Sequence, residues 1–325
     1  MTAERAFVPP AHRGWRLDES RSRVTAPTIS VVIPTKGRPA ILMKALRSVA
    51  DQGEYVREVI VVDGTKERAD EAALRSALAG APTAPVLVYC WAPADNGLPA
   101  ARNRGVRVAQ GDVIQFMDDD TTVEPHYFAH LQAAFAAPEV GGVGGLLIDP
   151  VADSRRLRAW FFRVVYVGPF RQDKDELYLR PPKVLTPSNT LPGASAYRRE
   201  VFRDFQFDEA LTGPAVGEDL DFSFRVGQQW SLVIEPRARM FHHRSPQERS
   251  TSRRAFADKV VFFHYHFRKN MRGSAADWVA FAWLNVGFFV DAAVRLHPQP
   301  VRGVLDGYRR IARAGLFFRP AAHRP

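Results

Sequence analysis

The chain has 325 residues with a hydrophobic content of 46%, which is enough for one large α/β domain with an appendage, or for two modest domains. A formal charge of +10 favours an anionic partner, whether nucleotide phosphates, nucleic acid or a lipid surface. The single cysteine, Cys90, excludes an internal disulfide and any cysteine-based metal site, so we expect a reducing, cytoplasmic compartment.

At the amino terminus, residues 1–27 mix Arg, Pro and Ser without an apolar core segment, so we expect a flexible arm and neither a signal peptide nor a membrane anchor. Strand-like and helix-like segments then alternate. Apolar, β-branched runs predict buried strands, and apolar residues at helical spacing predict the helices between them. The predicted strands are residues 29–33, 59–62, 85–89 and 113–117, and the predicted helices are residues 41–49, 67–78 and 99–108.

Because these strands are apolar throughout and are separated by helices, they predict a parallel sheet that is covered on both faces, a nucleotide-binding type of α/β architecture. The second half of the chain is less regular. The glycine-rich residues 141–145 are a weak phosphate-loop candidate and fit close backbone packing better. Residues 220–226 predict a helix and residues 231–234 a strand, whereas residues 152–180 give no clear pattern. The composition changes near residue 250, where we expect a boundary.

Three consecutive carboxylates, Asp118, Asp119 and Asp120, follow the fourth predicted strand. In open α/β sheets the ligand crevice lies outside the carboxyl ends of the strands. Clustered negative charge at that edge favours a divalent cation such as Mg²⁺ or Mn²⁺ that bridges carboxylates to phosphates. The alternative is a solvated acidic turn before a helix that begins near Glu124.

Other polar residues also stand where strands or helices begin and end. Asp63 follows the second strand, although Asp63-Gly64 could form only a tight turn. Glu218 and Asp219 open a later helix, where they could simply favour the positive end of the helix dipole. Asp221 and Arg225 have the spacing of an i,i+4 ion pair, for which we prefer a structural role.

Taken together and in order, these pieces resemble the inverting family 2 glycosyltransferases, which have the GT-A fold. The resemblance covers about residues 28–243. The matching segments are Val31–Thr35 with Arg38, Val61–Gly64, Asn96-Gly97 with Ala101–Gly105, Phe116–Thr121, Phe207–Glu209, Gly217–Asp221 with Arg225, and Glu235-Pro236 leading to His242.

The resemblance implies an α/β chain of three parts. After the arm, residues 28–250 would form the GT-A domain, a Rossmann-like nucleotide-binding sheet flanked by helices. Residues 251–325 would form a helical, aromatic and basic appendage. The implied activity is metal-dependent, inverting transfer of a sugar from a nucleotide diphosphate to a glycan, a lipid-linked acceptor or another cell-envelope acceptor.

The family's residue roles carry over to the matching positions of this sequence. Asp120 becomes the principal ligand of Mn²⁺ or Mg²⁺, Asp118 contacts the metal or the ribose, and His242 completes the metal site, with His243 as an alternative. Asp219 becomes the general base, with Glu218 in support.

The same resemblance places the nucleotide sugar at the first strand ends. Pro34, Thr35 and Arg38 would flank the nucleobase, Asp63 would accept a hydrogen bond from its ring, and Arg102 would meet the diphosphate. From the position of Asp63 we expect a UDP-type or dTDP-type donor. The remaining residues assigned to the nucleotide sugar are Asn96, Gly97 and Asp119.

The appendage includes residues 278–290, an apolar run shorter than the roughly 20 residues that span a bilayer. It could be a core helix, a helix in a homo-oligomer interface, or an interfacial helix at the cytoplasmic membrane face. Arginines near this run suit an anionic leaflet. They are Arg295, Arg302, Arg309, Arg310 and Arg313.

Two other functions fit parts of the sequence. A sugar nucleotidyltransferase would need a glycine-rich, Arg-containing loop after the first strand, and Pro34–Arg38 is a poor version of one. A basic nucleic-acid-binding protein would gather its positive charge into a reader motif, and the acidic triplet would oppose a phosphate backbone. We therefore expect no nucleic-acid partner.

Overall fold

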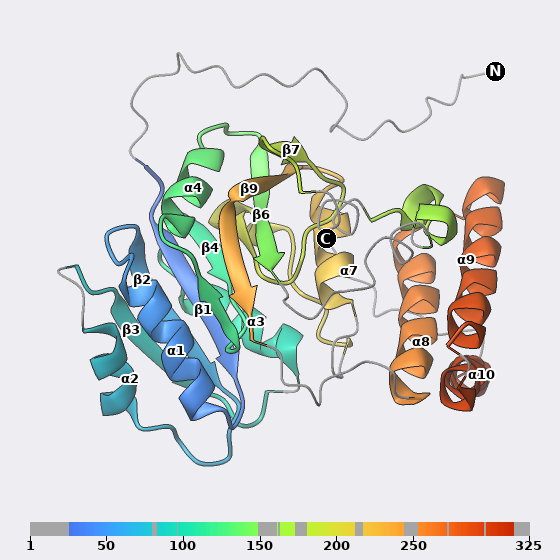
Figure 1. Cartoon of the computed structure of the whole chain (residues 1–325), viewed down its shortest axis with the longest axis horizontal. Helices are drawn as coiled ribbons and strands as arrows, with labels where there is room; N and C mark the ends of the chain where they lie inside the picture. The colour runs from blue at the N-terminus through green and yellow to red at the C-terminus, as the bar shows by residue number, and fades with distance from the viewer. Residues whose placement is uncertain are drawn as a thin grey trace.

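A computed structural model describes residues 26–79, 83–95, 97–148, 161, 163–172, 181–211, 217–243, 253–271, 273–295 and 297–314. They form an α/β body with a helical unit at one end (Figure 1). The strands are β1 (Ile29–Thr35), β2 (Val56–Asp63), β3 (Val86–Trp91), β4 (Val113–Phe116), β5 (Thr121–Val123), β6 (Val140–Ile148), β7 (Thr186–Pro187), β8 (Ser195–Arg198) and β9 (Ser231–His242). The α-helices are α1 (Pro39–Ala50), α2 (Glu71–Leu78), α3 (Leu98–Val108), α4 (Tyr127–Ala134), α7 (Glu218–Val226), α8 (Arg253–Asn270), α9 (Ala275–Ala293) and α10 (Pro298–Arg313), with 3-10 turns η2 (Gly168–Phe170) and η3 (Arg199–Arg203).

One sheet contains all of these strands, in the order β3-β2-β1-β4-β8-β6-β9-β5, with β7 paired to β9. The first four strands are parallel, as the sequence predicts. The second half of the sheet is mixed, because β8 runs antiparallel to both β4 and β6, and β5 runs antiparallel to β9. The fold is therefore α/β with a parallel half and a mixed half.

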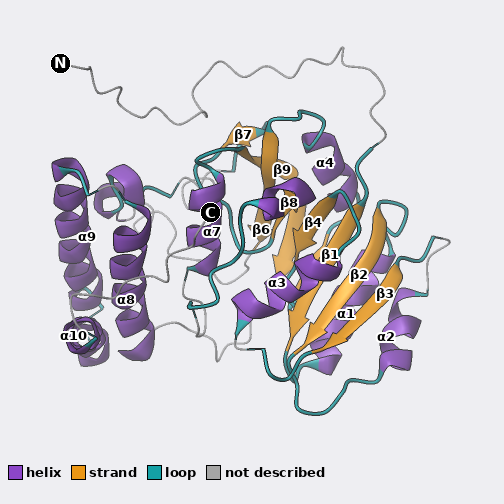
Figure 2. Cartoon of the chain, turned by 180° about the vertical axis from the view of Figure 1, so that it is seen from behind, coloured by secondary structure: helices purple, strands orange, loops and turns teal. Residues whose placement is uncertain are grey.

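Both faces of the sheet are covered (Figure 2). Side chains alternate between the two faces along a strand, so Val31 and Ile33 of β1 pack with α1, α2 and α4, whereas Val32 lies on the opposite face. On that opposite face, α3 crosses β1 so closely that a Cβ at Gly105 would lie 2.3 Å from a methyl carbon of Val32. Phe222 of α7 belongs to the same apolar cluster as Val32.

The glycine-rich segment lies in β6 and serves close packing, as the sequence predicts. A Cβ at Gly141 would lie 2.4 Å from the Trp230 side chain, and one at Gly145 would lie 2.5 Å from the backbone oxygen of Ala238. These glycines let β6 fit tightly beside β9 and its preceding turn.

The helical unit has an apolar core of its own, built from α8, α9 and α10 with residues 165–170 and Leu211 and Leu220. α8 lies between α9 and the α/β body (Figures 1 and 2). α9 begins with a capping box in which Ser274 and Asp277 exchange hydrogen bonds. Within the described residues, none of the helices combines the length and the apolar character needed to cross a bilayer.

Candidate active site

The acidic triplet lies beside the end of β1. Thr35 is the last residue of β1, and its Oγ1 donates a 2.8 Å hydrogen bond to Asp119 Oδ2. The Arg38 guanidinium lies 3.6 Å from Asp119 and 3.4 Å from Asp120. β1 and β4 are parallel neighbours, so their carboxyl ends meet at one edge, and the structure brings these four predicted residues together there.

Strand pairing brings a histidine from the far end of the sequence to the same place. β5 directly follows the triplet and pairs with the end of β9, with Thr121 opposite His242. As a result, His242 Nε2 lies 3.1 Å from Asp120 Oδ1. The next histidine, His243, turns its ring toward Thr122, with 2.8 Å between Nε2 and Oγ1. The geometry thus selects His242 over His243 as the partner of the triplet.

Asp118, Asp120 and His242 each offer one ligand atom, and these atoms all lie within 4.8 Å of one another. Two carboxylates and an imidazole are hard or borderline ligands that suit Mn²⁺ and Mg²⁺. Three protein ligands leave coordination positions for phosphate oxygens or water. The residues present therefore fit the divalent ion that the sequence suggested.

The electrostatics differ between neighbouring members of the triplet. Burial opposes ionisation of Asp120, but His242 and Arg38 outweigh it and hold the pKa of this carboxyl below its ordinary 3.8. For Asp119 burial prevails over the Thr35 hydrogen bond and the Arg38 charge, so its pKa is raised. Of Asp119 and Asp120, Asp120 is thus the carboxylate more firmly kept in the charged form that a cation requires.

A cavity of about 400 Å³ opens beside the triplet. Five residues predicted to bind the nucleotide sugar line it, namely Pro34, Thr35, Arg38, Gly97 and Asp119. Sequence reasoning missed Lys36 and Asp95 in its wall, although both stand in the turns that follow predicted strands.

Gly97 is the N-cap of α3 at a φ of 92°, a backbone conformation that favours glycine. Gly97, Leu98 and Ala101 at the start of α3 line the cavity, and the N-terminus of a helix is an arrangement that favours phosphate binding. Asn96, which was also predicted to bind the nucleotide sugar, lies outside the described residues.

Asp63 lies under this region and is only 1% exposed. One oxygen accepts hydrogen bonds from the backbone N–H and the hydroxyl of Thr65, and the other accepts from the Tyr89 hydroxyl at 2.7 Å and from the Ala69 N–H at 3.3 Å. A carboxylate can accept about four hydrogen bonds, and those from Thr65, Ala69 and Tyr89 occupy these positions. Asp63 anchors the loop after β2, and its contact with a nucleobase stays a prediction.

Arg102 of α3 is 2% exposed and joins the two sides of the site. Its Nη1 lies 3.1 Å from Glu218 and its Nη2 lies 3.5 Å from Asp118. Its guanidinium also stacks against the rings of Phe116 and Phe207. In the described structure this arginine is a buried bridge between carboxylates, and its predicted contact with the diphosphate stays a prediction.

The predicted base lies at the start of α7. Gly217 is the N-cap with φ 71°, and a Cβ there would lie 2.5 Å from the Phe262 ring, so both conformation and space require glycine. Glu218 and Asp219 occupy the first two helical positions, where the helix dipole favours negative charge. Burial, assisted by Asp219, raises the pKa of Glu218 although Arg102 opposes it. Arg102 thus links Glu218, one of the two carboxylates, to Asp118 of the metal candidate.

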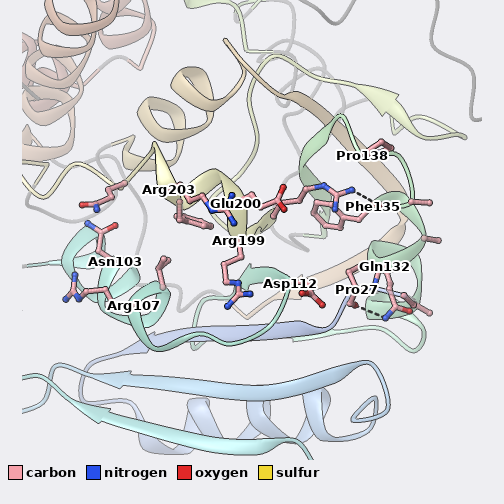
Figure 3. Close-up of a pocket in the computed structure, with 18 residues that line it drawn as sticks. Pro27, Asn103, Arg107, Asp112, Gln132, Phe135, Pro138, Arg199, Glu200 and Arg203 are labelled. Carbon is pink, nitrogen blue, oxygen red and sulfur yellow. Dashed lines mark hydrogen bonds between the residues drawn. The ribbon is translucent and has the colours of Figure 1, made fainter. Parts of the chain in front are cut away.

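A larger cavity of about 1170 Å³ lies elsewhere (Figure 3). Its wall includes Pro27 and Asp112, which precede β1 and β4, together with Arg199 and Arg203. It therefore lies at the amino ends of the parallel strands, opposite the triplet. None of the residues predicted for catalysis, metal or nucleotide lines it.

A mixed α/β sheet with a cluster of two carboxylates and a histidine beside a cavity of about 400 Å³ is the arrangement that the family resemblance predicts. Residues 30–205, more than half of the chain, match glycosyl transferase family 2, and the chain belongs to that family.

The chain is similar in sequence to two named bacterial proteins. The O-antigen biosynthesis protein RfbC of Myxococcus xanthus is 27% identical over 239 residues, which is 69% of this chain and 18% of that protein. An N-acetylglucosaminyltransferase of Azorhizobium caulinodans is 26% identical over 151 residues, 45% of this chain and 36% of that protein. The chain thus spans well under two thirds of either relative's length.

Solved structures support the fold. TarS 1–349 of S. aureus in complex with UDP-GlcNAc has a TM-score of 0.57 at 14% identity, over 87% of this chain and 81% of that one. The mannosyltransferase PcManGT of Pyrobaculum calidifontis, in complex with GDP-Man and Mn²⁺, has a TM-score of 0.55 at 17% identity, over 91% and 89%. At these identities the likeness shows the GT-A fold alone.

Proposed function

We propose that this glycosyltransferase is metal-dependent and inverting, and that it transfers a sugar from a UDP-type or dTDP-type donor to a glycan or lipid-linked acceptor of the cell envelope. The observation that carries the proposal is the convergence of Asp118, Asp120 and His242 beside the 400 Å³ cavity. The envelope acceptor is supported by the O-antigen protein among the relatives.

The residues divide the chemistry between two sides of the site. On the donor side, the cavity and the first turn of α3 would hold the nucleotide diphosphate, and Arg38 adds positive charge near the triplet. A divalent ion bound by Asp118, Asp120 and His242 would neutralise charge on the leaving diphosphate. On the acceptor side, Asp219 at the start of α7 would take the proton from the attacking hydroxyl.

The proposed step is a single displacement. The acceptor oxygen forms a bond to the anomeric carbon while the bond from that carbon to the diphosphate oxygen breaks, and the diphosphate leaves with the electron pair. The acceptor proton passes to an Asp219 carboxylate oxygen. Because attack and departure occur on opposite faces of the sugar, the anomeric configuration inverts.

The donor preference rests on the family resemblance and on UDP-GlcNAc in one structural neighbour, since Asp63 itself is engaged inside the protein. GDP-Man in another neighbour makes guanine the alternative to test. Calorimetric titration of the metal-loaded protein should give tighter binding of UDP or dTDP than of GDP. Tighter binding of GDP would reject the pyrimidine proposal and leave the transferase proposal in place.

Metal dependence is tested by binding as well as by turnover. Titration of Mn²⁺ into chelator-treated protein should show a site that is lost in Asp120→Asn and weakened in His242→Ala. The matched control is His243→Ala, which removes the neighbouring ring that faces Thr122 and should leave Mn²⁺ affinity unchanged. Full transfer activity in the presence of a chelator would reject the metal role.

A further inference from the structure

Helix α9 has an outer face that is apolar along its whole length. Every residue of α9 in the exposed class is Ala, Val, Trp or Phe. Half of the fourteen large hydrophobic side chains that are exposed in the described part of the chain belong to α9 or its C-cap. They are Trp278, Val279, Trp283, Val286, Phe289, Val290 and Val294, with exposed fractions from 40% for Phe289 to 70% for Val279.

The side chains of this outer face do not belong to the buried core of the helical unit. The opposite side of α9 supplies Leu284 and Phe288 to the buried cluster with α8. The two acidic residues of the helix point elsewhere, because Asp277 is used in the N-terminal capping box and Asp291 pairs with Lys259 and Arg295. No charge therefore interrupts the outer face.

Basic side chains lie along the edge that α10 adds to this surface. Phe289 of α9 stacks on Tyr308 of α10, with ring centroids 5.7 Å apart. Next to Tyr308 on α10, Leu305 and Arg309 are exposed, and Arg302 is exposed one turn earlier. The described residues from 253 to 314 contain ten Lys or Arg and four Asp, an excess of six positive charges.

We propose that the outer face of α9, with the exposed side of α10, binds an anionic lipid leaflet, and that α9 lies within the interface parallel to the membrane. An apolar helical face bordered by arginines is the chemistry that such a leaflet attracts. α9 is the outermost helix of its end of the molecule, with α8 between it and the α/β body, so a flat surface can reach it (Figures 1 and 2).

Charge favours a leaflet over a second copy of the chain. A twofold contact would place the same surface of both copies together, and the arginines of one copy would meet those of the other. An anionic headgroup layer instead pairs with them. This inference does not depend on the transferase proposal, because it concerns binding alone.

The test measures partition of the full chain onto vesicles of equimolar phosphatidylglycerol and phosphatidylcholine at low salt. Wild type should float with these vesicles. The double variant Val279→Asp with Val286→Asp should lose at least about tenfold in partition, because each valine that enters the leaflet removes apolar surface from water and so stabilises the bound state. The matched control is Val86→Asp with Val184→Asp, at valines that are 62% and 69% exposed on the α/β body. This control should bind like wild type.

A second pair of variants tests the charge. Arg302→Gln with Arg309→Gln should weaken binding by about fivefold per arginine on anionic vesicles at low salt. Arg57→Gln with Arg75→Gln on the α/β body is the control and should change little. Wild type that stays unbound, or control variants that lose as much binding as the α9 variant, would overturn the proposal. A solution dimer abolished by the α9 variant, with no vesicle binding, would assign the face to a second copy.

Discussion

The Arg102 guanidinium touches a carboxylate on each side of the candidate site, Asp118 on the metal side and Glu218 on the base side. Gly193 leaves room for it, since a Cβ there would lie 3.0 Å from Arg102 Nη2. A buried carboxylate is costly unless it is paired. Arg102 therefore fixes the distance between the two halves of the site while it compensates their charge.

Replacing Arg102 should cost both stability and turnover. Arg102→Met leaves Glu218 buried without its partner, so the free energy of unfolding should fall by about 3–5 kcal/mol. The control is Arg104→Met on the same helix, whose pair with Asp95 involves an arginine side chain that is 38% exposed. That variant should lose less than about 1 kcal/mol. Equal losses in urea unfolding would show that Arg102 does not act as a bridge.

Substitutions of the two carboxylates at the start of α7 should differ in their effect on kcat. Asp219→Asn removes the proposed base and should lower kcat by about two to four orders of magnitude, while donor affinity stays near wild type. Glu218→Gln keeps a polar partner for Arg102 and should reduce kcat less. Donor titration by calorimetry and turnover under saturating donor measure both effects. If Glu218→Gln were inactive and Asp219→Asn active, Glu218 would be the general base and Asp219 the supporting residue.

At the scale of elements, α7 is held to α8 by buried charges. Asp221 of α7 accepts hydrogen bonds from Lys269 at 2.9 Å and Asn270 at 2.8 Å, and the Arg225 pair predicted from sequence lies at 2.9 Å. Asp208 accepts from Tyr265 and Lys269. The helical unit thus fixes the helix that carries the proposed base.

Acid should weaken this contact between elements. Burial lowers the pKa of His266 below its ordinary 6.5, although Asp221 opposes the shift. For Asp221, burial favours a higher pKa, but the His266 hydrogen bond and the charges of Arg225 and Lys269 outweigh it and hold the pKa below 3.8. Each group binds protons more readily when unfolded, so its stabilising contribution is present at neutral pH and is lost as the pH falls.

The melting temperature should accordingly fall below pH 6.5, and again as the pH drops below 3.8. Asp221→Asn should lower stability at pH 7 by about 3–5 kcal/mol and flatten the decline at the acid end. Asp204→Asn, at an exposed aspartate, is the control and should change stability by less than about 0.5 kcal/mol. An unchanged acid decline in Asp221→Asn would exclude this carboxylate as its source.

The parallel half of the sheet could be predicted from sequence because β1, β2, β3 and β4 are continuous apolar runs with helices between them. In the mixed half, residues 231–234 of β9 could be predicted as a strand. β8 and β5 could not, since they have four and three residues and acquire their place only through distant partners. The same limit applies to the site. The triplet is visible in sequence, whereas the choice of His242 over His243 follows from the register of β5 on β9.

At the scale of the whole molecule, the helical unit and the α/β body share buried contacts, although the sequence predicts a boundary near residue 250. Phe262 of α8 packs against Gly217, and Lys269 of α8 neutralises Asp208 and Asp221. Removing residues 253–325 would take away the lysine that these two carboxylates share and leave Asp221 with Arg225 alone. The change in composition near residue 250 therefore need not separate two units that unfold independently.

We expect the full chain to unfold in one cooperative transition that includes the helical unit. In scanning calorimetry, the measured enthalpy should equal the van't Hoff enthalpy, the sign of two-state unfolding. A chain that ends before Arg253 should unfold at a much lower temperature or fail to fold, because buried carboxylates and apolar surface lose their partners. Lys269→Met in the full chain removes the shared cation alone and should lower the melting temperature without splitting the transition. Two separate transitions in the wild-type chain, with a truncated chain as stable as the first of them, would instead show that the two units fold independently.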